Sequence, residues 1–208
     1  FPNTRILVGK YDLKAAYRRA HLSGQSVAEC LTIFEGRLYA SLRFTFGGSP
    51  FPNLWSAHSE VIADLANDLV QCAAWDPTVL KSPIQDQLPE PLRIDSDEPF
   101  AQAKTMAVQL PDNDRGIAEC YLDDIPPVCV DIGDNAERCA AALPLALHIV
   151  GRPVEDSEPI PRDNLLSIKK TLGEGQMAEE RIVLGWNICT RKLSIELPTE
   201  KFTNWSND

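Results

Sequence analysis

The sequence IAECYLDDIPPVCV, residues 117–130, decides the expected fold because two apolar runs, Ile117–Leu122 and Ile125–Val130, meet at two adjacent acids. This pattern predicts a tight β-hairpin with Asp123 and Asp124 at its tip. Two carboxylates held in one small volume repel each other unless one is protonated or a cation binds between them. Asp is also a favoured turn residue, so the tetrapeptide YLDD alone does not separate a cation site from an ordinary turn.

Three further segments carry features of a site. Asp12 follows the apolar run Ile6-Leu7-Val8 and precedes a short helical pattern, which places a third acid at a strand end. Phe46-Gly47-Gly48-Ser49-Pro50 predicts a glycine-rich turn whose bare backbone permits close approach of a ligand. Val183-Leu184-Gly185-Trp186 opens a second expected hairpin, which ends at Leu197-Pro198.

In this order the segments resemble the palm of reverse transcriptases of the retrotransposon type. The likeness rests on an acid followed five residues later by an aromatic, an FG-x-x-P turn, a Y-x-D-D hairpin and an LGW hairpin. It covers the chain from about Lys10 to Lys201. The fold it implies is α+β: a polymerase palm, with a split βαβ or ferredoxin-like antiparallel sheet and helices on one face.

The resemblance implies an RNA-directed DNA polymerase, in which two metal ions assist nucleotidyl transfer from a dNTP to a primer 3′-hydroxyl. Its catalytic acids would be Asp12, Asp123 and Asp124. Together with the backbone carbonyl of Leu13, these acids would hold two Mg²⁺ or Mn²⁺ ions, which prefer oxygen ligands. The implied partners are an RNA or DNA template, a primer strand and a dNTP.

Other residues match the substrate contacts of the same family. Tyr17 would obstruct a ribose 2′-hydroxyl, and Phe46, Gly47 and Tyr121 would shape the nucleotide pocket. The primer grip would be formed by Leu184, Gly185 and Trp186. Lys169 or Lys170 is a candidate proton donor to the leaving pyrophosphate, although a solvated helix face is the interpretation that the sequence favours.

Two alternatives remain open from the sequence. One is a catalytically inactive or domesticated palm-derived domain that serves in binding or as a scaffold. The other is an RNA-dependent RNA polymerase, which would use the same three acids; Tyr17 and the LGW hairpin argue against it.

The remaining elements follow from local patterns. Cys30–Phe34 and Leu38–Thr45 are expected strands joined by a turn at Gly36. A helix is expected from Leu54 to before Pro77, with an apolar stripe that includes a packed His58. A second helix should begin at a capping box, Asp134–Glu137, and run through Leu147 with a kink at Pro144; a third should run over Asn164–Leu172, capped by Asp163 and ended by Gly173.

Length and composition set outer limits. A chain of 208 residues that is 44% hydrophobic can bury one substantial core, so one domain spanning residues 1–208 is expected. The family resemblance implies a partial reverse transcriptase domain, with fingers and thumb largely missing and with RNase H or integrase regions in a longer polyprotein. We therefore expect the 208 residues alone to be weakly active or inactive as a polymerase. No apolar run approaches 18 residues and no secretory signal is visible, which favours an intracellular protein, cytoplasmic or nuclear, with reduced cysteines.

Charge is distributed unevenly. Residues 1–60 hold seven Lys or Arg and four Asp or Glu, net +3, whereas residues 61–208 hold thirteen Lys or Arg and twenty-six Asp or Glu, net −13, so the whole chain has a net charge of −10. Nucleic-acid affinity normally comes from basic residues, so the net charge of the chain argues against a bound duplex, and the basic character around the Asp12 motif weakens that objection. Residues 76–116 hold six prolines and eight acids, and are predicted to form a mobile, solvated insertion without a function of its own.

Overall fold

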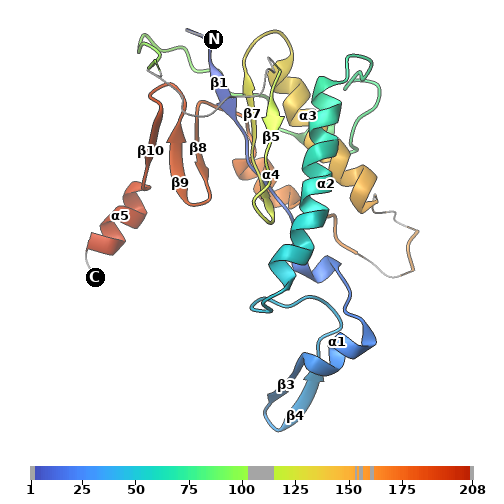
Figure 1. Cartoon of the computed structure of the whole chain (residues 1–208). Helices are drawn as coiled ribbons and strands as arrows, with labels where there is room; N and C mark the ends of the chain where they lie inside the picture. Colours follow the sequence, from blue (N-terminus) through green and yellow to red (C-terminus); the bar gives the residue numbers. More distant parts are fainter. Residues whose placement is uncertain (1–2, 103–114, 153, 155–156, 160–161, 207–208) are drawn as a thin grey trace.

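The computed structural model describes residues 3–102, 115–152, 154, 157–159 and 162–206 (Figure 1). It confirms an α+β chain with small antiparallel sheets. The strands are β1 (Ile6–Val8), β2 (Tyr11–Asp12), β3 (Leu31–Phe34), β4 (Arg37–Ala40), β5 (Ile117–Ala118), β6 (Asp124–Ile125), β7 (Pro127–Val130), β8 (Glu180–Val183), β9 (Trp186–Cys189) and β10 (Ser194–Glu196). The helices are α1 (Gly24–Glu29), α2 (Phe51–Gln71), α3 (Asn135–Gly151), α4 (Ile168–Glu174) and α5 (Thr199–Ser206), with 3₁₀ turns η1 (Ala16–Arg19) and η2 (Gln85–Gln87).

The centre of the fold is made by two chain segments that run antiparallel past each other. β1 pairs with β7, and β5 completes that sheet in the order β1-β7-β5. Beyond Gly9 the same two segments pair again as β2 and β6. Gly9 allows this close approach, because a Cβ there would lie 2.9 Å from the Pro127 side chain. One continuous pairing therefore leads from the buried sheet to the acids.

Helices α2 and α3 pack on each other and against β5 and β7. The buried face of α2 agrees only in part with the predicted stripe. Ile62 is buried as predicted, but Leu54 and Val61, also expected in the stripe, are about half exposed, and Trp55 and Ala66 are buried instead. His58 is exposed as well, so the prediction that its side chain packs on the apolar face of the helix was wrong. The helix turns this face inward because small side chains allow close contact with the alanine-rich α3. Among the described helices, none is both long and apolar enough to span a bilayer.

The predicted caps of the later helices are also wrong. Asp134 precedes α3 but its side chain makes no cap hydrogen bond, and Glu137 bonds to Arg93 instead. α4 begins after Ser167 rather than at Asn164, since Asp163 pairs with Lys14 at 2.8 Å. In both cases a distant cation competes for the carboxylate that the local pattern assigned to a cap.

The expected hairpins at Gly36 and at Gly185 both form. Glu35 and Gly36 have positive φ angles of 49° and 70°, which suits the two-residue turn between β3 and β4. Leu184 and Gly185, with φ angles of 50° and 82°, make the corresponding turn between β8 and β9. The β3–β4 hairpin projects away from the sheet and α3, while β8, β9 and β10 lie on the opposite side of β1 from α2 (Figure 1).

Part of the proline-rich insertion packs against this framework. Ser82 and Ile84 are buried, and the Leu92 N–H donates to the Met177 carbonyl at 2.8 Å. Arg93 forms a bidentate pair with Asp131 at 2.9–3.0 Å. A fully solvated loop was thus the wrong expectation for these residues; residues 103–114 of the insertion lie outside the described residues.

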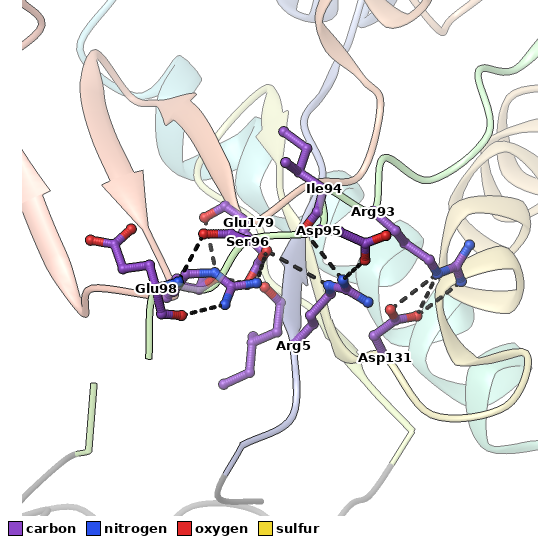
Figure 2. A network of polar contacts seen from close by, with 11 residues as sticks. Arg5, Arg93, Ile94, Asp95, Ser96, Glu98, Asp131 and Glu179 are labelled. Carbon is purple, nitrogen blue, oxygen red and sulfur yellow. Dashed lines mark hydrogen bonds and ion pairs between the residues drawn. The ribbon is translucent and has the colours of Figure 1, made fainter. Parts of the chain in front are cut away.

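Residues 94–101, here called the strap, are held against the rest of the fold by hydrogen bonds from two further arginines (Figure 2). Arg5 donates to Asp95 at 2.9 Å. Arg191 donates to the Glu98 carbonyl and to the Glu179 carboxylate, both at 2.8 Å. The strap therefore joins the segment before β1 to the end of β9, which explains how an acidic, proline-rich stretch acquires a fixed place.

Candidate active site

The sheet places the three predicted acids together through backbone pairing. Asp12 lies directly opposite Asp124 in the β2–β6 ladder. The Leu13 N–H donates to the Asp123 carbonyl at 3.0 Å, which fixes the turn against the end of β2. Acids that are 111 positions or more apart in sequence thus share one end of a two-stranded ribbon.

The turn that carries Asp123 is tight and strained. Tyr121 and Asp124 exchange backbone hydrogen bonds of 2.8 and 3.1 Å, so Leu122 and Asp123 form the two-residue tip. The prediction that Asp124 lies at the tip was therefore wrong, because its backbone pairs with Tyr121 and Asp124 begins β6. Leu122 has φ 58°, a left-handed conformation that costs a non-glycine residue roughly 1 kcal/mol. The indole Nε1 of Trp55 donates to the Leu122 carbonyl at 3.2 Å and helps to hold this conformation.

The three acids repel one another, and the positive charges of two lysines partly offset this repulsion. Burial raises the pKa of Asp124, and the charges of Asp123 and Asp12 raise it further, against the lowering effect of Lys10 and Lys170. Lys170 Nζ donates to Asp12 Oδ1 at 2.8 Å. This bond raises the pKa of Lys170, so the amine is held in its charged form.

The donor atoms suit a hard cation, although they do not converge as a preformed cage. Carboxylate oxygens of Asp12, Asp123 and Asp124 are the type of ligand that Mg²⁺ prefers. Within the part of the chain that the structure describes, no three His, Cys, Asp or Glu side chains lie close enough to hold a metal ion. Lys170 contacts one of the two carboxylate oxygens of Asp12, Oδ1.

An aromatic cluster borders the acids. The Tyr17 ring meets Phe46 edge-on at 5.4 Å between centroids, and meets Trp55 at 6.4 Å. Burial, followed by the charges of Asp123 and Tyr121, raises the pKa of Tyr17. Two residues predicted as substrate contacts, Tyr17 and Phe46, are therefore brought together beside the acid-bearing turn.

The glycine-rich turn has the conformation its sequence requires. Gly47 has φ 88°, which L side chains rarely adopt, and a Cβ there would meet no neighbouring atom. The constraint at Gly47 is thus one of backbone conformation. Phe46 beside it is 70% exposed and Tyr121 is 61% exposed, so both rings are available to a ligand.

The predicted primer-grip residues lie apart from this cluster. Leu184, Gly185 and Trp186 occupy the turn between β8 and β9 and the start of β9, on the other side of β1 (Figure 1). Leu184 and Trp186 are 45% and 47% exposed. Their described polar contact is local: Lys201 Nζ lies 3.5 Å from the Gly185 carbonyl.

Two contributors were not assigned by sequence reasoning. Lys170 was expected on a solvated helix face, yet it reaches Asp12 because α4 packs against β2. Trp55 was not singled out at all, and its position one turn after the start of α2 is the only signal that it would lie near the glycine-rich turn. Both contacts arise from packing between segments that are far apart in sequence.

Comparison with known proteins adds no assignment: no family model, curated protein or solved structure matches this chain. Function is therefore argued from the residues and their geometry.

Proposed function

We propose that this chain is a reverse transcriptase palm, which catalyses transfer of a nucleotide from a dNTP to a primer 3′-hydroxyl. The observation that carries the proposal is the β2–β6 ladder, which sets Asp12 opposite Asp124 with Asp123 in the adjoining turn. Carboxylates from two separate strands at one ribbon end are what two-metal phosphoryl transfer requires. The order of the four sequence motifs supports the same function.

Each part of the site has a role in this proposal. Bound Mg²⁺ or Mn²⁺ ions would neutralise the triphosphate and favour loss of the primer hydroxyl proton. Asp12, Asp123, Asp124 and the Leu13 carbonyl would hold them. Lys170 would donate a proton to the leaving pyrophosphate; its contact with Asp12 at 2.8 Å supports this role.

The aromatic cluster would select the sugar. Tyr17 lies between Phe46 and Trp55, whose edge-on contacts restrict movement of its ring. A rigid ring beside the acids would obstruct a ribose 2′-hydroxyl and so favour dNTP. Template, primer and dNTP are the proposed partners, with Leu184, Gly185 and Trp186 as the primer grip.

A second candidate function is a catalytically inactive palm-derived binding domain. The contact that favours it is the ion pair between Lys170 and Asp12 at 2.8 Å, because a lysine can stabilise the acid cluster without any metal. The two candidates differ in what they predict for divalent ions.

The test is thermal unfolding of the 208-residue chain with and without Mn²⁺, followed by dNTP addition to a primed RNA template. For the polymerase we expect Mn²⁺ to raise the melting temperature, because an ion that binds only the folded state stabilises it. Asp123→Ala should abolish this rise and lower any primer extension by about a hundredfold or more, a loss comparable to removing one group that acts directly on the reacting atoms.

Asp64→Ala is the matched control, since Asp64 is an exposed acid on α2 and is not one of the three acids of the site. It should retain the response to Mn²⁺. Equal melting temperatures with and without Mn²⁺, together with no extension by wild-type protein, would reject the polymerase and leave the inactive binding domain. Faster addition of rNTP than dNTP would instead indicate an RNA polymerase.

A further inference from the structure

A second recess lies next to the candidate active site and shares Trp55 with it. It has a volume of about 390 Å³ and is bordered by η1, the start of α2, the end of α3 and the segment before α4. Sites for small ligands typically enclose 300–1,000 Å³, so one nucleotide unit would fit. Its polar lining is Arg19, His21, Arg43, His58 and Arg162.

Of the three arginines that line this recess, Arg162 is paired with the Glu158 carboxylate at 2.7 Å, whereas Arg19 and Arg43 donate to backbone carbonyls. Arg19 donates to the carbonyls of Lys14, Asp163 and Asn164, at 3.2, 2.7 and 2.7 Å. The Asp163 carboxylate is itself paired with Lys14. Carbonyls satisfy N–H donors but do not neutralise a guanidinium, which has five such donors. Arg19 therefore keeps its charge and has N–H groups beyond these three bonds.

Arg43 adds a second cation. It donates to the Arg18 carbonyl at 2.7 Å, and among the described residues no carboxylate lies within ion-pair distance of Arg43 or Arg19. Burial lowers the pKa of Arg19; Asp163 opposes this, while the charges of Arg162 and Arg43 lower it further. A bound anion would reduce the repulsion among these arginines.

Two aromatic rings, those of Trp55 and His58, line the recess together with these arginines. The His58 ring stacks on Trp55 with centroids 5.5 Å apart and planes within 7°. Trp55 is only 3% exposed, whereas His58 is exposed. Stacked rings extend a planar surface on which a base can lie, and Arg binds phosphate through paired N–H donors.

We propose that this recess, lined by Arg19, Arg43, Trp55 and His58, binds a nucleotide unit, with its phosphate on the arginines and its base against His58. The unit can belong to a free nucleotide or to a single strand of nucleic acid. This site is separate from the acid cluster and goes beyond the proposed polymerase function. Because its charge is positive, it binds phosphate without a divalent metal.

Isothermal titration in EDTA tests the site without involving metal at the acids. The probes are a nucleoside 5′-monophosphate, the corresponding nucleoside, inorganic phosphate and a single-stranded oligonucleotide. We expect the monophosphate to bind more tightly than either the nucleoside or inorganic phosphate, because both halves of the site contribute. Tighter binding of the oligonucleotide indicates a strand, and binding of the monophosphate alone indicates a free nucleotide; both support the site.

The variants separate a specific site from general attraction. Arg43→Gln should weaken monophosphate binding about tenfold, the loss of one charged hydrogen bond. Arg37→Gln is the matched control: it removes the same charge from exposed β4 and should change affinity less than about twofold. His58→Ala should weaken the monophosphate but not inorganic phosphate, and Asp123→Ala should leave both unchanged.

Several results would overturn the proposal. These are no binding of the monophosphate at about 10 mM, equal losses in Arg43→Gln and Arg37→Gln, or equally tight binding of an acidic peptide. If circular dichroism shows that a variant does not fold, the affinity of wild-type protein for the monophosphate is measured at increasing NaCl. An affinity that does not fall with added NaCl would exclude a phosphate held by the arginines.

Discussion

The acid cluster at Asp12 and Asp124 and the basic recess at Arg19 and Arg43 lie close to the same indole, that of Trp55, yet they balance their charge differently. Lys170 donates to Asp12 at 2.8 Å from a side chain that is 54% exposed. Arg19 donates to three backbone carbonyls, which satisfy N–H groups but leave the charge of the guanidinium in place. A side-chain cation thus offsets charge at the acids, whereas backbone oxygens alone are bonded to Arg19 among the described contacts.

Removing the indole of Trp55, which lies near both regions, should have the largest effect on stability. Trp55→Ala is expected to lower the free energy of unfolding by about 3–5 kcal/mol, because a buried indole leaves a cavity and the Leu122 carbonyl loses its donor. Urea denaturation measures this loss. Trp205→Ala on α5, where the side chain is 69% exposed, should change stability by less than about 0.5 kcal/mol. Equal losses in the two variants would show that Trp55 does not tie the regions together.

Arg19→Met should have an intermediate effect on the basic side alone. Methionine keeps the volume but leaves three carbonyls without their donor, which costs about 1–2 kcal/mol for partly buried groups. Arg43→Gln removes one exposed bond and should lie near zero by the same urea measurement. A loss from Arg19→Met no greater than that from Arg43→Gln would contradict the view that backbone binding fixes this arginine.

Asp124→Asn should have the smallest effect, visible mainly through its pH dependence. The pKa of Asp124 is raised in the folded protein, so its stabilising contribution is present below the ordinary Asp value near 4 and is lost as pH rises through the folded value. The variant should therefore match wild type at low pH and become more stable above it, by less than about 1 kcal/mol because solvent screens this half-buried group.

Urea denaturation of both proteins at pH 3 and pH 7 measures whether the variant becomes more stable than wild type as the pH rises. Asp64→Asn is the control and should show no such difference between the two pH values. A variant that is less stable than wild type at pH 7 would mean that Lys170 and Lys10 outweigh the repulsion among the acids.

Sequence reasoning succeeded where neighbours in the chain set the conformation. The turns at Gly36 and Gly185 formed as predicted, because positive φ angles are a property of the residue at that position. The end position of Asp12 in a strand also agrees with the prediction, whereas its pairing with Asp124 was not predicted. These predictions needed no knowledge of which distant groups compete for a side chain.

Reasoning from the sequence failed where a distant partner changed a local choice. Glu137 and Asp163 were assigned to helix caps, yet Arg93 and Lys14 bind them across the fold. The inward face of α2 was set by contact with α3, since Trp55 and small residues pack there better than Leu54. A charge or an apolar stripe has several possible partners, and only the packed chain selects one.

The sequence alone determined the hairpins, the glycine turns and the acid-bearing strand ends, because steric limits on φ and the alternation of apolar residues act within a few positions. The tertiary structure decided that Lys170 meets Asp12, that the strap joins β1 to β9, and that Arg19 and Arg43 face the stacked rings of Trp55 and His58. Those contacts join residues far apart in the chain, and their free energy depends on burial and distance, which a linear sequence does not contain.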